Sequence, residues 1–255
     1  MSSREEKLAK SLTAESIELI PFLPYLLQDL WELGSSPKDM INLISRNIDI
    51  TKNTRILDLA CGKGAVSVNM AKKFGCQVKG IEIMSDFIVV AKQKSQEHNV
   101  QHLCDFIIAD INESVKIEKG YDIVILGAVG DVLGNQEETL LKLSATIKEE
   151  GYILIDDGYA KSPSEGPYLS KEKWLEIIRK SGFELVEDLL VNEIDFSGVL
   201  EDQEASIKIR TSELKDKYPD KVHLFEQYME SQIAECDELE NDIIGVTILL
   251  KKRKF

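Results

Sequence analysis

The stretch ILDLACGKGAV, residues 56–66, joins a short apolar run to a glycine-containing turn and then to the start of an amphipathic segment. Gly62 and Gly64 let the backbone turn tightly and approach a ligand closely. A helix that follows such a turn presents free N–H groups and the positive end of its dipole to an anionic group. The stretch therefore predicts a strand, a turn that can bind a carboxylate, and a helix.

Acidic residues end the next two strands that the sequence predicts. Glu82 stands at the end of the second strand, where a carboxylate can accept hydrogen bonds from both hydroxyls of a ribose. Asp110 follows the third strand, where it can accept a hydrogen bond from the exocyclic amine of adenine. Together with the glycine turn, these residues predict a ligand that carries a carboxylate, a ribose and an adenine.

Short apolar runs alternate with amphipathic stretches from residue 54 onwards, which is typical of βαβ units and of a parallel sheet. We expect an α/β three-layer α-β-α sandwich with a seven-stranded, mostly parallel sheet and the ligand at the carboxyl ends of the first strands. Asn135 and Glu138 form a capping box at the start of the helix before strand five, and Gly151 marks the end of that helix. The expected strands are 55–59, 77–83, 105–109, 122–126, 152–156, 183–191 and 244–251, and the expected helices between them are 66–74, 86–97, 136–149 and 171–181.

Two helical additions are expected on a single domain of residues 1–255. Residues 1–50 form an N-terminal cap, with Ser36 and Pro37 at a helix start and large apolar and aromatic residues at 20–33. Residues 193–242 form an insertion between strands six and seven, with fifteen acidic and five basic residues. The regular apolar face after Pro219 predicts that this acidic segment is folded.

The composition limits the partners and the compartment. The net charge of −14 repels phosphate backbones and anionic lipid, which disfavours nucleic acid as the main partner. Four scattered cysteines form neither a disulfide framework nor a zinc site. The longest apolar stretches are far shorter than the ~20 residues that span a bilayer, and the first ten residues lack the pattern of a secretion signal. We expect a cytoplasmic protein without a membrane helix.

The segment DLACGKG, residues 58–64, resembles the glycine motif of the class I S-adenosylmethionine-dependent methyltransferases. The resemblance implies S-adenosylmethionine as cofactor, with Asp58 ordering its amino group, Glu82 its ribose and Asp110 its adenine amine. It also implies an antiparallel last strand. Backbone at Gly127 would hold the methionine part, and two isoleucines would clamp the adenine. The implied cofactor-binding residues are Asp58, Ala60, Gly62, Gly64, Glu82, Ile83, Asp110, Ile111 and Gly127.

One position departs from the family pattern, and two other interpretations of the site are weaker. Ala60 replaces the first glycine of the motif, so we expect the backbone there to avoid a positive φ. A dinucleotide-binding fold would want a third glycine where Ser67 stands. Asp156 and Asp157 invite a magnesium interpretation, but Gly127 stands where a third ligand would end strand four, so no metal is expected.

The acceptor site is expected beneath the cap and the insertion, which would close over the strand ends and exclude water. Asp131 either faces the substrate or begins a turn with Gly134, and His223 reaches the pocket if the insertion is a lid. The seven acids and no bases of residues 222–250 indicate either a cationic acceptor or a solvated helix face. The candidate substrate residues are Tyr25, Trp31, Asp131, Asp157, Tyr159 and His223.

The sequence therefore predicts an enzyme that transfers a methyl group to a small-molecule acceptor and releases S-adenosylhomocysteine. Alternatives are a protein or RNA methyltransferase and a binding module that senses the cofactor without chemistry. The acceptor atom, the use of a general base, the pathway and the oligomeric state are not specified by the sequence.

Overall fold

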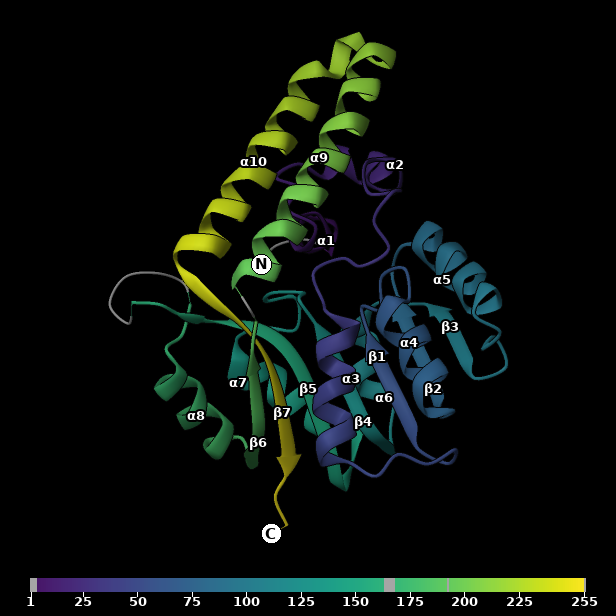
Figure 1. Cartoon of the computed structure of the whole chain (residues 1–255), viewed down its shortest axis with the longest axis vertical. Coiled ribbons are helices and arrows are strands. Elements are labelled where there is room, and N and C mark those ends of the chain that lie inside the picture. The colour runs from purple at the N-terminus through teal and green to yellow at the C-terminus, as the bar shows by residue number, and fades with distance from the viewer. Residues whose placement is uncertain (1–3, 163–167, 192, 255) are drawn as a thin grey trace.

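A computed structural model describes residues 4–162, 168–191 and 193–254. In these residues, a seven-stranded sheet has the order β3-β2-β1-β4-β5-β7-β6 (Figure 1). Strand β7 is antiparallel to both of its neighbours, and the other strands run in one direction. The expected fold class is therefore confirmed. The strands are β1 (Arg55–Leu59), β2 (Gln77–Glu82), β3 (Cys104–Ile108), β4 (Tyr121–Gly127), β5 (Ile147–Ala160), β6 (Phe183–Leu190) and β7 (Ile243–Lys252).

Helices cover both faces of the sheet because its central strands carry apolar side chains on both sides. Leu57 and Val124 point to one face, and Ile56 and Ile123 point to the other, as the alternation of side chains along a strand requires. The first face packs against α6 (Ile111–Ile117), α7 (Gln136–Ser144) and α8 (Lys171–Lys180), and the second against α3 (Pro37–Asn47), α4 (Ala65–Phe74) and α5 (Ser85–Glu97).

Local capping residues fix the beginnings of three helices, two of which, α3 and α7, begin with the residues that the sequence analysis named. Ser36 Oγ accepts a hydrogen bond from the Asp39 N–H at 3.2 Å at the start of α3. Asn135 and Glu138 form both bonds of a capping box at α7. Ser170 Oγ accepts from the Lys173 N–H at 3.3 Å at the start of α8. These side chains satisfy N–H groups that have no partner inside the helix.

The expected helix at 136–149 is wrong beyond Ser144, where α7 ends. Residues 147–149 begin β5 instead, because Ile147 pairs with Tyr121 at the edge of β4. Gly151 lies inside β5, next to a register shift, and a Cβ there would come within 3.1 Å of the Lys148 carbonyl oxygen. Tertiary pairing thus overrides the helical pattern of this segment. The sequence patterns also do not predict α6.

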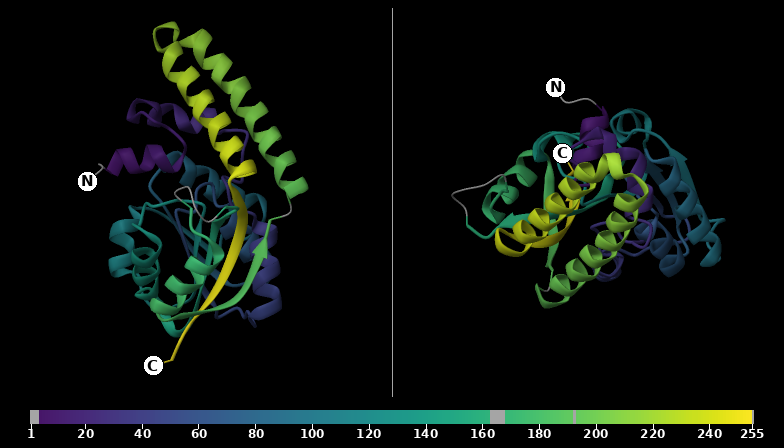
Figure 2. Two further views of the ribbon diagram at one scale, coloured as in Figure 1. Left: turned by 90° about the vertical axis from the view of Figure 1, so that its left-hand side faces the viewer. Right: turned by 90° about the horizontal axis from the view of Figure 1, so that it is seen from above.

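The cap and the insertion share a third apolar cluster above the carboxyl ends of the strands. Phe22 of the cap packs edge-on against Phe225 of the insertion, with ring centroids 5.1 Å apart. Met84 and Phe87 join the same cluster from the body of the protein. Figures 1 and 2 show the insertion as a helical hairpin that rises beside the cap. Of the expected cap, residues 1–50, the elements above the strand ends are α1 (Arg4–Ser11), η1 (Ile17–Phe22) and α2 (Leu23–Leu26), whereas α3 covers a face of the sheet. The insertion comprises α9 (Glu193–Lys217), η2 (Pro219–Lys221) and α10 (Val222–Asn241).

Within the described residues, no helix combines the length and the apolar character that crossing a membrane requires.

Candidate functional site

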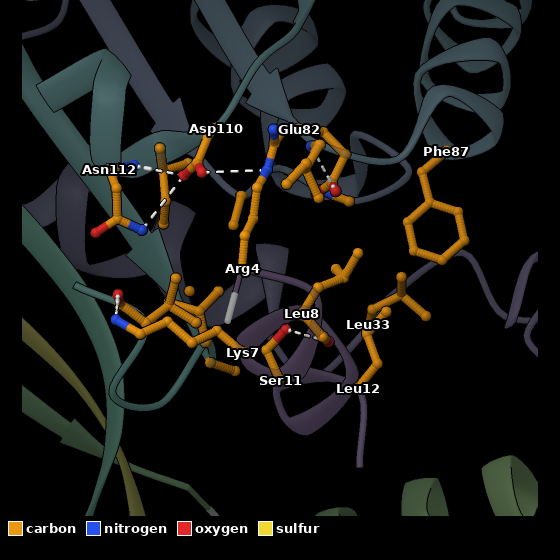
Figure 3. A pocket seen from close by; sticks show the side chains of 18 residues that line it. Arg4, Lys7, Leu8, Ser11, Leu12, Leu33, Glu82, Phe87, Asp110 and Asn112 are labelled. Carbon is orange, nitrogen blue, oxygen red and sulfur yellow. Dashed lines mark hydrogen bonds and ion pairs between the residues drawn. The ribbon is translucent and has the colours of Figure 1, made fainter. Parts of the chain in front are cut away.

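A cavity of about 280 Å³ lies between the carboxyl ends of the central strands and helix α1 (Figure 3). A smaller cavity of about 40 Å³ adjoins it and reaches Asp58 in β1. Leu33, Ala60, Gly62 and Gly127 line both, so the two cavities meet at the glycine turn. The larger cavity is lined by Arg4, Lys7, Leu8, Ser11, Leu12, Leu33, Ala60, Gly62, Glu82, Ile83, Phe87, Asp110, Ile111, Asn112, Gly127, Ala128, Val129 and Val132.

The glycine turn between β1 and α4 uses left-handed backbone at several positions. Gly62 has φ +52° and Gly64 has φ +75°, a region that glycine enters without a steric penalty. Ala60 also has a positive φ of 55°, so the expectation that it avoids this region is wrong. The chain must reverse direction directly after β1, and an alanine accepts the strain of about 1–2 kcal/mol that this geometry imposes.

Glu82 is the most firmly held side chain of the site. Its Oε1 accepts hydrogen bonds from the N–H groups of Ile83 and Met84 at 2.7 and 2.9 Å, and its Oε2 accepts from the Gly62 N–H at 3.1 Å. Burial raises the pKa of this carboxyl, and the three N–H groups partly offset the effect. The carboxylate therefore ties the end of β2 to the glycine turn and keeps acceptor capacity for a ligand.

Asp58 lies at the smaller cavity and is almost fully buried. Its Oδ2 accepts a hydrogen bond from Ser67 Oγ of α4 at 2.5 Å. Burial raises the pKa of Asp58 to about 7, with Ser67 acting in the opposite direction. A cationic group in the smaller cavity would stabilise the ionised form, because an opposite charge nearby favours ionisation.

Asp110 links the sheet to α1 as well as to α6. Its Oδ1 caps α6 by accepting from the Asn112 N–H at 2.8 Å. Its Oδ2 lies 3.2 Å from Arg4 Nε, and Figure 3 shows the Arg4 side chain reaching from α1 to this carboxylate. Ile83 and Ile111 line the same cavity beside the two acids. The structure thus brings together the residues that the sequence assigned to ribose and adenine.

Of the candidate substrate residues, Trp31 lies at the smaller cavity, while the other five are outside the linings of both cavities. Trp31 Nε1 donates to the Lys63 carbonyl oxygen at 3.0 Å. Tyr25 donates instead to Glu213 Oε2 of α9 at 2.6 Å. His223 is exposed at the start of α10.

Of three further candidates, Asp131 lies in the loop after β4, and Asp157 and Tyr159 lie in β5. Asp131 begins a turn, because its carbonyl oxygen accepts from the Gly134 N–H at 2.9 Å, and its carboxylate is exposed. Asp157 accepts from the Gly158 N–H at 2.7 Å, and burial raises its pKa to about 6. Tyr159 is buried in the core and donates to Asp188 at 3.2 Å. Contact of these residues with an acceptor stays a prediction.

Helix α1 and Lys63 are the parts of the site that sequence reasoning missed. Leu8 in α1 and Leu12 just after it stand four residues apart and both line the cavity, a spacing that could have been found in the sequence. Lys63 is buried, and its Nζ donates to the carbonyl oxygens of Leu27 and, at 2.6 Å, of Leu30. Burial lowers the pKa of Lys63 to about 8. A residue inside the glycine turn therefore holds the cap.

The magnesium interpretation has no support in the arrangement of side chains. Asp156 accepts from Thr247 Oγ1 of β7 at 2.6 Å, and burial raises its pKa to about 6. Among the residues that the structure describes, no group of three or more His, Cys, Asp or Glu side chains could hold a metal ion.

A family model described as a methyltransferase domain matches residues 50–187, more than half of the chain. A malonyl-(acyl-carrier protein) O-methyltransferase from Bacillus cereus is 25% identical over 117 residues, which cover 46% of this chain and 42% of that protein. A ribosomal protein L11 methyltransferase from Dictyoglomus thermophilum is 28% identical over 158 residues, covering 59% of this chain and 48% of that protein. The chain thus spans less than half the length of these two relatives.

A solved structure of similar fold is an S-adenosylmethionine-dependent methyltransferase from Thiobacillus denitrificans, in complex with S-adenosyl-L-homocysteine. Its TM-score is 0.75 at 18% identity, and the match covers 91% of this chain and 98% of that chain. At this identity the similarity concerns the fold.

Proposed function

Because the chain belongs to the methyltransferase domain family, as its glycine turn predicted, we propose that it transfers a methyl group from S-adenosylmethionine to a small-molecule acceptor. The family, the enzyme class and the methyl donor are those that residues 58–64 predicted. The acceptor class and the assignment of individual residues are the parts proposed here. The observation that carries the proposal is the continuous row of Asp58, Glu82 and Asp110 along two adjoining cavities.

Each residue of this row fits one part of the cofactor. Asp58 offers a buried carboxylate to the amino group, and Glu82 offers a carboxylate that three N–H groups hold in position for the ribose. Asp110 would accept from the adenine amine between Ile83 and Ile111. Gly62 of the glycine turn and Gly127 line both cavities, so their backbone is open to the methionine part. In this proposal, the site residues follow the same order along the cavities as the amino acid, ribose and adenine parts along the cofactor.

Methyl transfer places modest demands on the protein. When bound, S-adenosylmethionine supplies a methyl group that its sulfonium already activates. The chain must hold the acceptor in line with that methyl group and keep water away. The apolar side chains of α1, with Leu33 and Val129, form the wall that would exclude water. A general base is required only for an acceptor that carries a proton on its reacting atom.

The position of α1 favours a small acceptor over a protein or RNA. Helix α1 lines the cavity across from the strand ends, and Lys7 Nζ donates to the Val132 carbonyl oxygen in the loop after β4 at 3.1 Å. We expect this helix to hinder a macromolecular side chain from entering the larger cavity. The chain's acidity adds an electrostatic penalty for RNA. The domain arrangement of one methyltransferase core with a cap and an insertion, and the cytoplasmic location, stay parts of the same proposal.

Calorimetry with S-adenosylhomocysteine tests the cofactor assignment. We expect Glu82→Gln to weaken binding at least about tenfold, because hydrogen bonds to a charged group contribute about 1.5–3 kcal/mol. Glu97→Gln, on the exposed face of α5, is the matched control and should bind as the unchanged protein does. Absence of binding by the unchanged protein, or equal affinities of the two variants, would contradict the proposal. Release of S-adenosylhomocysteine with members of a metabolite library would distinguish an enzyme from a sensing module.

A further inference from the structure

The α1 side of the larger cavity is left to the acceptor if the sheet side holds the cofactor, and this step rests on the proposed function. Figure 3 shows Glu82 and Asp110 on the sheet side and Lys7, Ser11 and Leu12 on the α1 side. The loop after β4 completes the α1 side through Val129 and Val132. The side chains of this α1-side wall therefore indicate which chemical groups the acceptor carries.

Most of this wall is apolar. Leu8 comes from α1 and Leu12 directly follows it, Leu33 comes from the segment after α2, and Val129 and Val132 come from the loop after β4. Pockets of this kind hold the apolar part of a ligand and use a few polar groups to orient it. The acceptor is therefore expected to have an apolar body.

Lys7 is the polar group that stands out on this wall. Its Nζ donates to the Val132 carbonyl oxygen at 3.1 Å, and an ammonium has three donors, so two remain available. The ion pairs among the described residues include none with Lys7. Arg4 and Lys10, one turn before and one turn after, are paired with Asp110 at 3.2 Å and Asp131 at 3.4 Å.

The acidic insertion does not place a carboxylate in the cavity lining that would neutralise the charge of Lys7. Among the described residues, none from α9 or α10 lines either cavity. Glu213 pairs with Arg210, and Glu226 pairs with Lys215, on the hairpin itself. Glu235 accepts a hydrogen bond from Thr13 and is otherwise exposed. The indication of a cationic acceptor from residues 222–250 thus has no side chain at the cavity to support it.

We infer that the acceptor is a small amphipathic anion, with an apolar body against α1 and a carboxylate or phosphate group bound by Lys7. A partly enclosed cation with spare donors favours an anion, because charge-assisted hydrogen bonds are stronger than neutral ones. Lys7 then determines specificity by selecting the charge of the acceptor, while the apolar wall is tolerant of its shape.

Four probes with one apolar chain and different head groups test this inference on the protein saturated with S-adenosylhomocysteine. Ligand-observed NMR would give affinities for hexanoate, hexyl phosphate, hexylamine and hexanol at constant ionic strength. At least one anionic probe should bind about tenfold more tightly than hexylamine. Lys7→Gln should reduce that preference about tenfold and leave hexanol binding unchanged, because glutamine keeps the helix propensity and loses the charge. Lys7→Arg should retain the preference.

Lys10→Gln is the matched control, because it removes the same charge one turn further along α1 from a side chain that is 73% exposed. We expect it to change the affinities less than twofold. Equal binding of all four probes, preference for hexylamine, no binding of either anion, or equal effects of the Lys7 and Lys10 variants would overturn the inference. Failure of S-adenosylhomocysteine itself to bind would instead overturn the proposed function. The two failures are therefore distinguishable.

Discussion

The two sides of the cavity are built in different ways. On the sheet side, strands and the glycine turn set the positions, and Glu82 is fixed by three backbone N–H groups. On the α1 side, the wall is positioned by long-range contacts of side chains, such as the partly exposed pair of Arg4 with Asp110. Exposed ion pairs contribute about 0–1 kcal/mol, so each ion pair of α1 is weak.

This difference indicates that the sheet side is rigid before any ligand binds, whereas the α1 side depends on the sum of many small contributions. Lys63 connects the two, because it belongs to the glycine turn and donates to the carbonyl oxygens of the cap. Substitutions on the sheet side should therefore have large individual effects. Substitution of Lys63 should have an intermediate effect. Titration of a single carboxyl should have a smaller effect still.

The largest effect is expected for Gly64→Ala, which would break the sheet side directly. Gly64 has φ +75°, and a Cβ there would lie 2.8 Å from Ala91 Cβ and 3.0 Å from Phe106 Cζ. The free energy of unfolding should fall by about 2–4 kcal/mol, from backbone strain together with overpacking. Gly75→Ala, at the other end of α4, is the matched control, since it has φ +65° and no atom within 4 Å. Urea denaturation showing equal losses for both variants would remove the packing argument.

An intermediate effect is expected for Lys63→Met, which separates the cap from the glycine turn. Methionine keeps the apolar stem but removes the Lys63 donor from both carbonyl oxygens; that of Leu27 still accepts from the Leu30 N–H, whereas that of Leu30 loses its partner. The free energy of unfolding should fall by about 1–3 kcal/mol, the cost of unsatisfied buried polar groups. Lys73→Met, on the exposed side of α4, should have no measurable effect. A variant at position 63 as stable as this control would show that the cap is held by its apolar cluster alone.

A smaller effect is expected from the titration of Asp58. Its pKa is raised to about 7 in the protein without ligand, so much of it is protonated at pH 6 and most of it is ionised at pH 8. On the proposed assignment, the cationic amino group of S-adenosylhomocysteine would pair with the ionised form of Asp58, so affinity should rise about tenfold from pH 6 to pH 8 and binding should release a proton. Calorimetry in buffers of different ionisation enthalpy measures both quantities. Asp58→Asn should abolish the dependence, and its persistence in that variant would assign it to another group.

The sheet side could be predicted from the sequence because its signals are local. Residues 56–66 contain the strand, the turn and the helix start, and acids at the ends of consecutive parallel strands must meet at one edge. Ala60 is the exception, because its own preference argues against the positive φ that the turn imposes. Residues 147–149 are another, since pairing with β4 overrides their helical pattern.

By itself, the sequence determined the fold class, the family and the row of Asp58, Glu82 and Asp110. The alternation of strands and helices, the motif that residues 58–64 resemble and the acids near the strand ends are each contained in short stretches. Only the tertiary structure decided which part of the cap faces the cavity. Lys7 and Val132 are 125 residues apart, and nothing local to either of them specifies that they touch. The structure likewise placed the acids of α10 outside the cavity lining, because α9 and α10 pack as a hairpin against the cap through one shared apolar cluster.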